Sequence, residues 1–394
     1  MRLAMVIQRF RPSFGGQGIQ VESLCAALSQ RGIGPTVYTA NPGDAPAAEE
    51  TDGYQVRRVR TDFRGKPQHW PAFGARIHRA LRRDQPDLVH VHGLTDALYA
   101  SWLYCRTSAR PLIFEMTLLG VDEPSALEAS TARLRWLRRR LYRQANAYVA
   151  MSHAFEASYV ASGLPRERLH VIPQGVDTNR FSRGDGATLA ARRADLGLPA
   201  SGPIVAFVGS LIERKGIDVL LRAWPSVRRS AAGSTLVLVG PGDFTEPAAQ
   251  AAFAALSDED RAAVVRLGKR DDIEQILAAA DVFTFPSRRE GFGTVIIEAM
   301  ATELPCVVAE LPGITDFIFE NPAETAGSDP AADGLVVPQE SPELLARAIT
   351  SVLADPQGAQ RIGACGRRRA RAAFELSTVV DQYVELYNAL GAAR

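Results

Sequence analysis

The chain has 394 residues, more than one hydrophobic core usually serves, so we expect two domains. Its 46% hydrophobic and 23% charged residues are typical of a folded globular protein and exclude a disordered chain. The net charge of +1 excludes an overall basic field for nucleic acid, and no apolar run reaches the roughly 18 residues of a membrane-spanning helix.

The first half alternates short apolar runs with helical patterns, which is typical of βαβ units and parallel sheets. Strands are expected at 3–7, 35–39, 54–60, 87–91, 111–115 and 147–151, with helices between them that include 18–30 and 126–144. This half is basic, with 24 Lys and Arg against 16 Asp and Glu up to residue 180. The excess indicates either an anionic partner such as a membrane surface, or a chance asymmetry of two solvated surfaces.

Three features of this half could carry chemistry. Gly15 and Gly16 lie between the first strand and helix, where a glycine loop lets backbone approach a phosphate, although a tight turn uses the same residues. His90 and His92 lie two apart on one strand and share a face, but a metal site needs a third ligand, which we did not find. We therefore predict no metal there. The histidines are either structural or catalytic.

The segment 133–143 combines six arginines with Trp136 and a narrow apolar stripe. Such a helix can lie on an anionic membrane, or it can pack on its own sheet with solvated arginines.

The second half repeats the βαβ pattern after a linker at 181–203. Strands are expected at 204–208, 235–239, 264–267, 282–285 and 306–309, and a last helix at 377–390. Arg214 and Lys215 follow the first of these strands, where open α/β sheets bind ligands. Two cations at that position can stabilise the charge of a departing diphosphate, whereas an exposed basic pair is the simpler interpretation.

The most informative segment is 286–301, in which Glu290 and Glu298 flank a Gly-Phe-Gly turn and the start of a helix. A helix N-terminus attracts anions, and an ionised carboxylate can accept hydrogen bonds from two neighbouring hydroxyls. A phosphate beside a polyol is the chemistry of a nucleotide sugar. An ordinary helix N-terminus with acidic residues is the alternative.

This segment resembles the donor-binding signature of the retaining glycosyltransferases of family 4, which have the GT-B fold, and the resemblance covers nearly the whole chain. It implies two Rossmann-like domains with parallel sheets facing across a cleft: residues 1–180 with a returning C-terminal helix at 377–394, and residues 181–376. The first domain would bind the acceptor and the second the nucleotide-sugar donor.

The resemblance also implies roles for individual residues. Glu290, Lys215, Arg214 and His92 would be catalytic: Glu290 would contact the transferred sugar, the two cations the diphosphate, and His92 the acceptor cleft. Glu298 would hold the ribose. The remaining donor contacts would come from Gly15, Gly16, Gly209, Ser210, Gly240, Lys269, Arg270, Gly291, Phe292, Gly293, Thr294 and Val295.

Two positions depart from the family pattern. Ser210 stands where relatives carry an arginine, and Arg214 is a hypothetical replacement for its charge. A histidine that relatives carry after the next strand is absent, which leaves Glu115, Thr117 and Asp122 as the polar groups there. The second departure concerns the acceptor side and leaves the donor site untouched.

We therefore predict a retaining, metal-independent hexosyltransferase of glycan, glycolipid or glycoconjugate biosynthesis. It would need no cofactor and would take a donor nucleotide sugar, a UDP-sugar before a GDP-sugar. The acceptor would be a carbohydrate, a lipid-linked or a small-molecule hydroxyl, and no nucleic acid is expected as partner. Residues 1–8 are too short for a signal peptide and the cysteines have no paired spacing, so we expect a cytoplasmic protein, with peripheral contact with the inner membrane as an open question. The alternatives are a nucleotide-sugar-binding protein with little transfer activity and a phosphorolytic enzyme of the same fold.

Overall fold

The computed structural model describes residues 1–12, 15–41, 43, 45–60, 70–129, 135–184 and 189–392. The chain forms two compact units, one made of Met1–Gly175 with the C-terminal segment that starts at Leu376, the other of Val176–Glu375.

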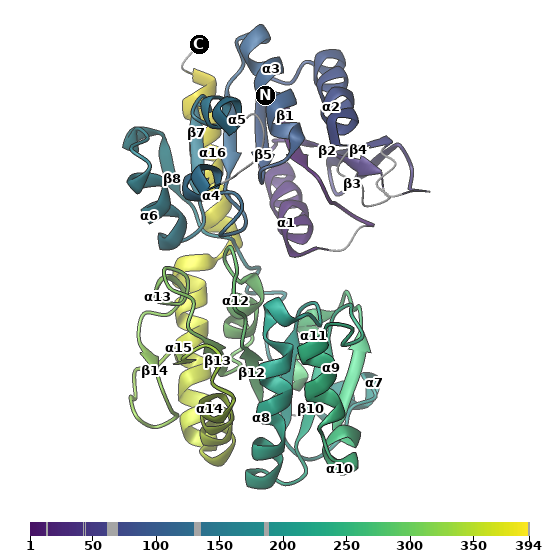
Figure 1. Ribbon diagram of the computed structural model, residues 1–394, viewed down its shortest axis with the longest axis vertical. Helices are drawn as coiled ribbons and strands as arrows, with labels where there is room; N and C mark the ends of the chain where they lie inside the picture. Colours follow the sequence, from purple (N-terminus) through teal and green to yellow (C-terminus); the bar gives the residue numbers. More distant parts are fainter. Residues whose placement is uncertain are drawn as a thin grey trace. The chain divides into compact units, whose positions relative to one another are not determined.

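The first unit has one sheet with helices on its faces (Figure 1). Its elements are β1 (Leu3–Ile7), α1 (Gly16–Gln30), β2 (Thr36–Asn41), β3 (Ala48–Thr51), β4 (Tyr54–Arg60), α2 (Trp70–Asp84), β5 (Leu88–His92), α3 (Asp96–Ser108), β6 (Leu112–Glu115), α4 (Pro124–Ala129), α5 (Arg135–Tyr142), β7 (Ala147–Ala150), α6 (His153–Ala161), the 3-10 turn η2 (Arg166–Arg168), β8 (Leu169–Val171) and α16 (Leu376–Ala392).

The sheet of the first unit has the order β3-β4-β2-β1-β5-β6-β7-β8 and is parallel except for β3, which pairs antiparallel with β4. Strands β1 and β5 are buried along their whole length because helices cover both faces of the sheet, which explains their continuous apolar runs. The strand order reverses between β1 and β5. The loops after these two strands, which carry Gly15 and follow His92, therefore border the crevice where such sheets bind ligands.

The C-terminal helix α16 belongs to the core of the first unit. Val379, Val380, Tyr383, Leu386 and Tyr387 recur at helical spacing, and all are buried against α1 and the sheet. Helices α1 and α16 lie in contact.

The second unit has a second sheet with helices on its faces. Its elements are α7 (Leu189–Asp195), β9 (Ile204–Val208), the 3-10 turn η4 (Glu213–Lys215), α8 (Ile217–Ser230), β10 (Thr235–Val239), α9 (Pro247–Ala254), α10 (Asp258–Ala262), β11 (Val264–Gly268), α11 (Ile273–Ala279), β12 (Val282–Phe285), α12 (Thr294–Ala301), β13 (Cys306–Ala309), α13 (Thr315–Ile318), β14 (Pro322–Ala323), β15 (Gly334–Val337), α14 (Pro342–Ala354) and α15 (Pro356–Phe374).

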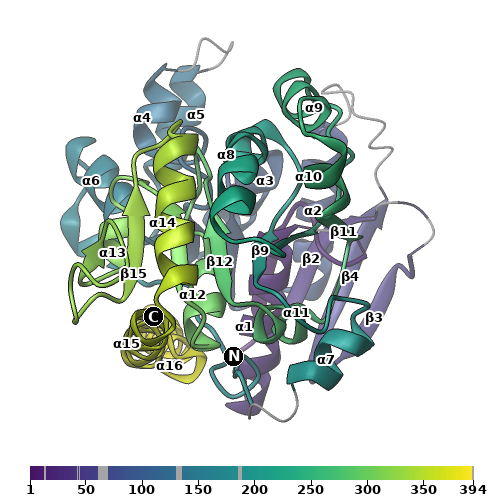
Figure 2. The same ribbon diagram turned by 90° about the horizontal axis from the view of Figure 1, so that it is seen from below.

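The sheet of the second unit is parallel throughout, in the order β11-β10-β9-β12-β13-β15-β14. Helices α8 and α14 lie in contact over one face, and α12 contacts α15 over the other (Figure 2). Strand order reverses between β9 and β12, so the loops after these strands border the ligand crevice of this unit. Lys215 and Glu290 lie on these two loops.

In the parts of the chain that the structure describes, no helix is both long enough and apolar enough to cross a membrane. The basic segment 133–143 lies partly outside the described residues. Within α5, Trp136 is 65% exposed.

Candidate functional site

The loops after β9 and β12 meet backbone to backbone. Gly216, which begins α8, has φ +70°, and a Cβ on it would lie 1.8 Å from the Pro286 carbonyl oxygen. The amide of Arg288 donates to the Arg214 carbonyl at 2.9 Å. Only glycine permits this approach, and the approach sets the Arg-Lys pair against the segment that carries Glu290.

The loops after β10 and β11 join the same edge of the sheet. A Cβ on Gly240 would lie 2.0 Å from the Gly209 carbonyl oxygen, so glycine is required there too. The Gly240 amide donates to Gly268 at 2.8 Å, which places the loop of Lys269 and Arg270 beside it. The structure therefore brings the expected donor residues of the second unit to one edge.

Lys215 and Glu290 form the centre of this edge. The lysine Nζ donates to Glu290 Oε1 at 2.6 Å, and the Ser287 hydroxyl donates to the same oxygen at 2.5 Å. Arg214 donates to the Arg289 carbonyl at 2.6 Å and lies 3.4 Å from Glu290 Oε1. Every contact falls on Oε1. Glu290 Oε2 thus has no protein partner within the described residues and can accept from a ligand hydroxyl.

The pair is largely withdrawn from water, with side chains 15% exposed for Lys215 and 9% for Glu290. Burial lowers the pKa of Lys215, which the neighbouring Glu290 charge partly opposes. The ammonium also lies 4.9 Å from the centre of the Phe285 ring. Lys215 and Arg214 together outnumber the single carboxylate, so the site keeps a surplus positive charge that suits a diphosphate.

Arg288, next to the site, belongs to a structural network that the sequence did not reveal. Its guanidinium binds Asp218 at 2.7 and 2.8 Å, and it also pairs with Glu340 and donates to the Glu213 carbonyl. These two carboxylates raise the pKa of Arg288. The network ties the start of α8 to the Glu290 loop and leaves Arg288 without a free donor role.

The turn from Gly291 to Val295 starts helix α12. Gly293 caps the helix at φ +90° and makes no side-chain capping hydrogen bond. Phe292 is 2% exposed and packs its ring on Phe317 and Phe374, which means that only its backbone can face a ligand. Thr294 and Val295 are partly buried at the first turn.

Glu298 lies on α12 and is partly buried. Within the described residues its carboxylate accepts no hydrogen bond, while the two charged side chains that influence it, Arg180 and Glu274, pair with each other at 2.9 Å. Burial raises the pKa of Glu298 from 4.5 to about 7, lowered somewhat by Arg180 and raised further by Glu274. A buried carboxylate without a donor is suited to bind hydroxyls that a ligand supplies.

The remaining expected donor residues of this unit differ in what they offer. Ser210 and Gly209 are partly exposed at the end of β9, Lys269 is exposed, and Arg270 is held by Asp272 through two hydrogen bonds of 2.8 and 2.5 Å. The arginine charge is therefore largely neutralised in this state.

In the first unit, Gly15 caps α1 with extended backbone, and neither Gly15 nor Gly16 has an atom within 4 Å of an added Cβ. Among the described residues, nothing fills the space in front of these glycines. Phe14, which precedes them, lies outside the described residues.

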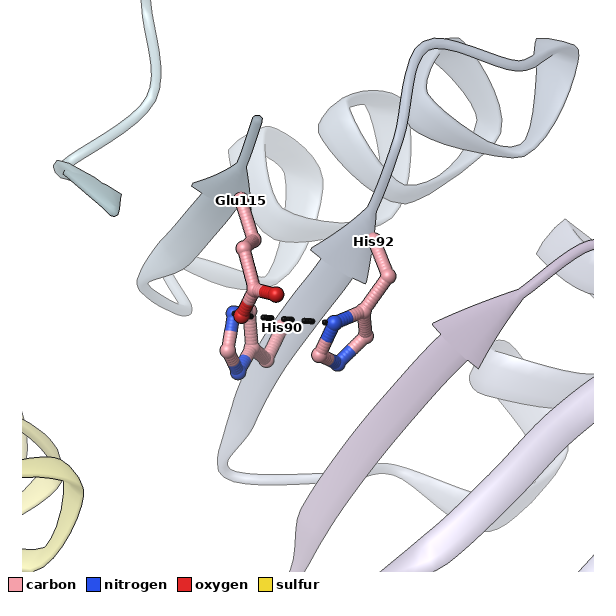
Figure 3. Close-up of side chains that lie close together, drawn as sticks. All are labelled: His90, His92 and Glu115. Atoms are coloured by element: carbon pink, nitrogen blue, oxygen red, sulfur yellow. Dashed lines mark ion pairs between the residues drawn. The ribbon is translucent and has the colours of Figure 1, made fainter. Parts of the chain in front are cut away.

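His92 is buried, at 2% exposure, in a cluster with His90 and Glu115 (Figure 3). Its Nδ1 lies 3.4 Å from Glu115 Oε2 and its Nε2 is 3.5 Å from the Met5 sulfur. Glu115 was named from the sequence, but its place beside the two histidines was not predicted. The Tyr383 hydroxyl donates to Glu115 at 2.9 Å. This contact was not predicted from the sequence, because Tyr383 belongs to the apolar face of the last helix.

Asp122 organises the loop where relatives carry the missing histidine. It accepts from the amides of Leu94, Thr117 and Leu118 at 2.8 to 3.1 Å and from the Thr117 hydroxyl at 2.5 Å. Burial raises the pKa of Asp122, and these hydrogen bonds oppose the rise. The carboxylate thus holds the loops after β5 and β6 together.

Two protein-family models match this chain, one in each unit. The model of the glycosyltransferase family 4 domain matches residues 14–180, and the model of group 1 glycosyl transferases matches residues 202–355. A D-inositol 3-phosphate glycosyltransferase of Nocardia farcinica is 30% identical over 398 residues, covering 95% of this chain and 85% of that protein. The alpha-maltose-1-phosphate synthase of Mycolicibacterium smegmatis is 27% identical over the full length of both.

Solved structures give the same fold. Sucrose-phosphate synthase from Thermosynechococcus elongatus superposes with a TM-score of 0.80 at 25% identity, over 100% of both chains. HepE of Anabaena, solved with UDP and glucose, gives 0.77 at 22% identity over 99% of this chain and 100% of the other. The expected GT-B class, with two parallel-sheet α/β units, is confirmed.

Proposed function

Because this chain belongs to the group 1 glycosyltransferases of family 4, we propose that it moves a sugar with retention of configuration from a UDP-sugar to an acceptor hydroxyl. The observation that carries the proposal is the buried Lys215–Glu290 pair at the switch point of the second sheet. It sets a surplus of positive charge beside a carboxylate oxygen that no described protein group contacts.

In the proposed donor complex, the diphosphate lies against Lys215, Arg214 and the N-terminus of α12. Glu290 accepts hydrogen bonds from sugar hydroxyls through its unused oxygen, and Glu298 accepts from the ribose. Gly209, Ser210, Gly240, Lys269 and Arg270 border the nucleotide. Gly15 and Gly16 offer open backbone from the first unit.

We propose front-face transfer. The acceptor oxygen bonds to the anomeric carbon on the face from which the diphosphate leaves, and the departing phosphate oxygen takes the acceptor proton. The protein contributes position and charge stabilisation rather than a covalent nucleophile. Since Lys215 and Arg214 supply the positive charge, we propose that no divalent ion is needed at the diphosphate.

The acceptor is proposed to be a polyol or sugar, because the relatives named above are an inositol phosphate glycosyltransferase and a maltose phosphate synthase. Lipid-linked glycan precursors remain a second acceptor class, supported by the basic first half and the exposed Trp136. A cytoplasmic site of action, at the inner membrane or free of it, fits either acceptor.

The donor half of the proposal is tested by thermal unfolding with UDP, GDP, ADP and TDP. A nucleotide at 100 times its dissociation constant adds about 2.7 kcal/mol, which we expect for UDP and for none of the others. If no nucleotide raises the unfolding temperature, the proposal is wrong. A shift without transfer would identify a nucleotide-sugar-binding protein, and product that depends on free phosphate a phosphorolytic enzyme.

The chemical half is tested with variants. Lys215→Ala should lower the transfer rate about 10²–10³-fold, as removal of one charge-stabilising donor does elsewhere. Arg229→Ala, an exposed arginine on α8, is the matched control and should keep the wild-type rate. If Lys215→Ala and Glu290→Ala both transfer at the wild-type rate, the assignment of the pair is wrong.

A further inference from the structure

The cluster of His90, His92 and Glu115 lies in the interior of the first unit. His90 and His92 project from the same face of β5, and Glu115 lies opposite His92 in the register of β6. All three side chains converge (Figure 3) and are nearly inaccessible, at 0%, 2% and 4% exposure. Within the described residues, no other group of three or more such side chains could hold a metal ion.

Two nitrogens of this cluster lie within ion-pair distance of the carboxylate but do not reach hydrogen-bond geometry with it (Figure 3). His90 Nε2 lies 3.3 Å and His92 Nδ1 lies 3.4 Å from Glu115 Oε2, and neither forms a hydrogen bond. A charge-assisted hydrogen bond would measure about 2.7–2.9 Å. Ligand atoms bound to one tetrahedral zinc at about 2.0–2.1 Å are themselves about 3.3 Å apart. The two nitrogen–oxygen separations match the second arrangement, and all three ligand atoms lie within 4.8 Å of one another.

We propose that His90 Nε2, His92 Nδ1 and Glu115 bind a divalent transition metal of the zinc type. Two imidazoles and a carboxylate are a common ligand set for zinc. The cluster borders a cavity of about 20 Å³, which His92, Glu115, Tyr383 and Gln17 help to line. This volume is large enough for one water, which we assign as the fourth ligand.

The surroundings supply the support that metal ligands usually have. His90 Nδ1 lies 2.9 Å from the Tyr387 hydroxyl, which fixes the ring with Nε2 toward the cluster. The Tyr383 hydroxyl donates to Glu115 at 2.9 Å. Both tyrosines belong to α16, so the ion would link β5 and β6 to the C-terminal helix. Its role is structural, and the site does not depend on the donor chemistry proposed above.

The test uses the full-length chain, without an affinity tag, after removal of bound metal by a chelator. Co²⁺ is added as a spectroscopic probe, and Zn²⁺ is added in a parallel thermal unfolding series. We expect one Co²⁺ per chain with the visible absorption of a four-coordinate site, displaced by Zn²⁺. Zn²⁺ at 100 times its dissociation constant should raise the Tm of the 394-residue chain by about 3 °C.

Variants locate the ion. His92→Ala and Glu115→Gln should abolish the cobalt spectrum, whereas His170→Ala, a histidine of β8 outside the cluster, should keep it. Since a core variant can fail to fold, the wild-type titration decides by itself: a wild-type protein that binds no stoichiometric Co²⁺ overturns the proposal. Equal binding by wild type and folded His92→Ala would also overturn it and leave the cluster as a buried ion triad.

Discussion

Replacing Glu298 with glutamine should stabilise the ligand-free protein while it weakens nucleotide binding. The Glu298 carboxylate is partly buried and accepts no hydrogen bond within the described residues. Glutamine has nearly the same shape and no charge to desolvate. The substitution therefore separates the contribution of Glu298 to stability from its proposed contribution to ribose binding.

The magnitude follows from the raised pKa. Glu298 titrates near pH 7 in the folded chain and near 4.5 when unfolded, so the folded state retains a proton that the unfolded state has lost between these values. Unfolding free energy therefore falls as the pH rises from about 4.5 to 7, and the full loss is present at pH 8. At about 1.36 kcal/mol for each unit of pKa the loss is about 3 kcal/mol, or about 2–3 after allowance for partial exposure.

The assay is thermal unfolding of wild type and Glu298→Gln from pH 4.5 to 8. At pH 8 the variant should melt about 2–4 °C higher, and the difference should vanish near pH 4.5. Glu324→Gln, an exposed glutamate of the same unit, is the control and should follow the wild type. A Glu298→Gln variant that is less stable at pH 8, or a difference independent of pH, would refute the reasoning.

Two further predictions concern the same unit. If ribose hydroxyls bind the Glu298 carboxylate, UDP should lower the pKa of Glu298 and release protons near pH 6–7. Calorimetry in buffers of different ionisation enthalpy measures this proton release. Binding that is independent of pH and releases no protons would contradict the ribose contact. Gly216→Ala should destabilise the chain by several kcal/mol because its Cβ would overlap the Pro286 carbonyl, whereas Gly233→Ala, at φ +80° with open space, should cost only about 1–2 kcal/mol in denaturant unfolding; equal losses would show that the close approach is not rigid.

The sequence alone was sufficient for the parts of the fold that depend on local pattern. Continuous apolar runs predicted β1, β9 and β12 because a strand buried on both faces has no polar alternation. The short strands β3, β8, β14 and β15 were not predicted, since two to four residues leave little pattern. The glycine turn before α12 was also predicted from the sequence, because its backbone geometry needs glycine.

Only the tertiary structure decided which side chains meet. The pairing of Lys215 with Glu290 follows from the strand order, which brings β9 beside β12 although they are far apart in sequence. Arg288 lies beside this pair, but Asp218 and Glu340 neutralise its charge. Glu115 joins His90 and His92 for the same reason: hydrogen bonds between neighbouring strands set the register, and that register is a non-local property that residue types do not encode by themselves.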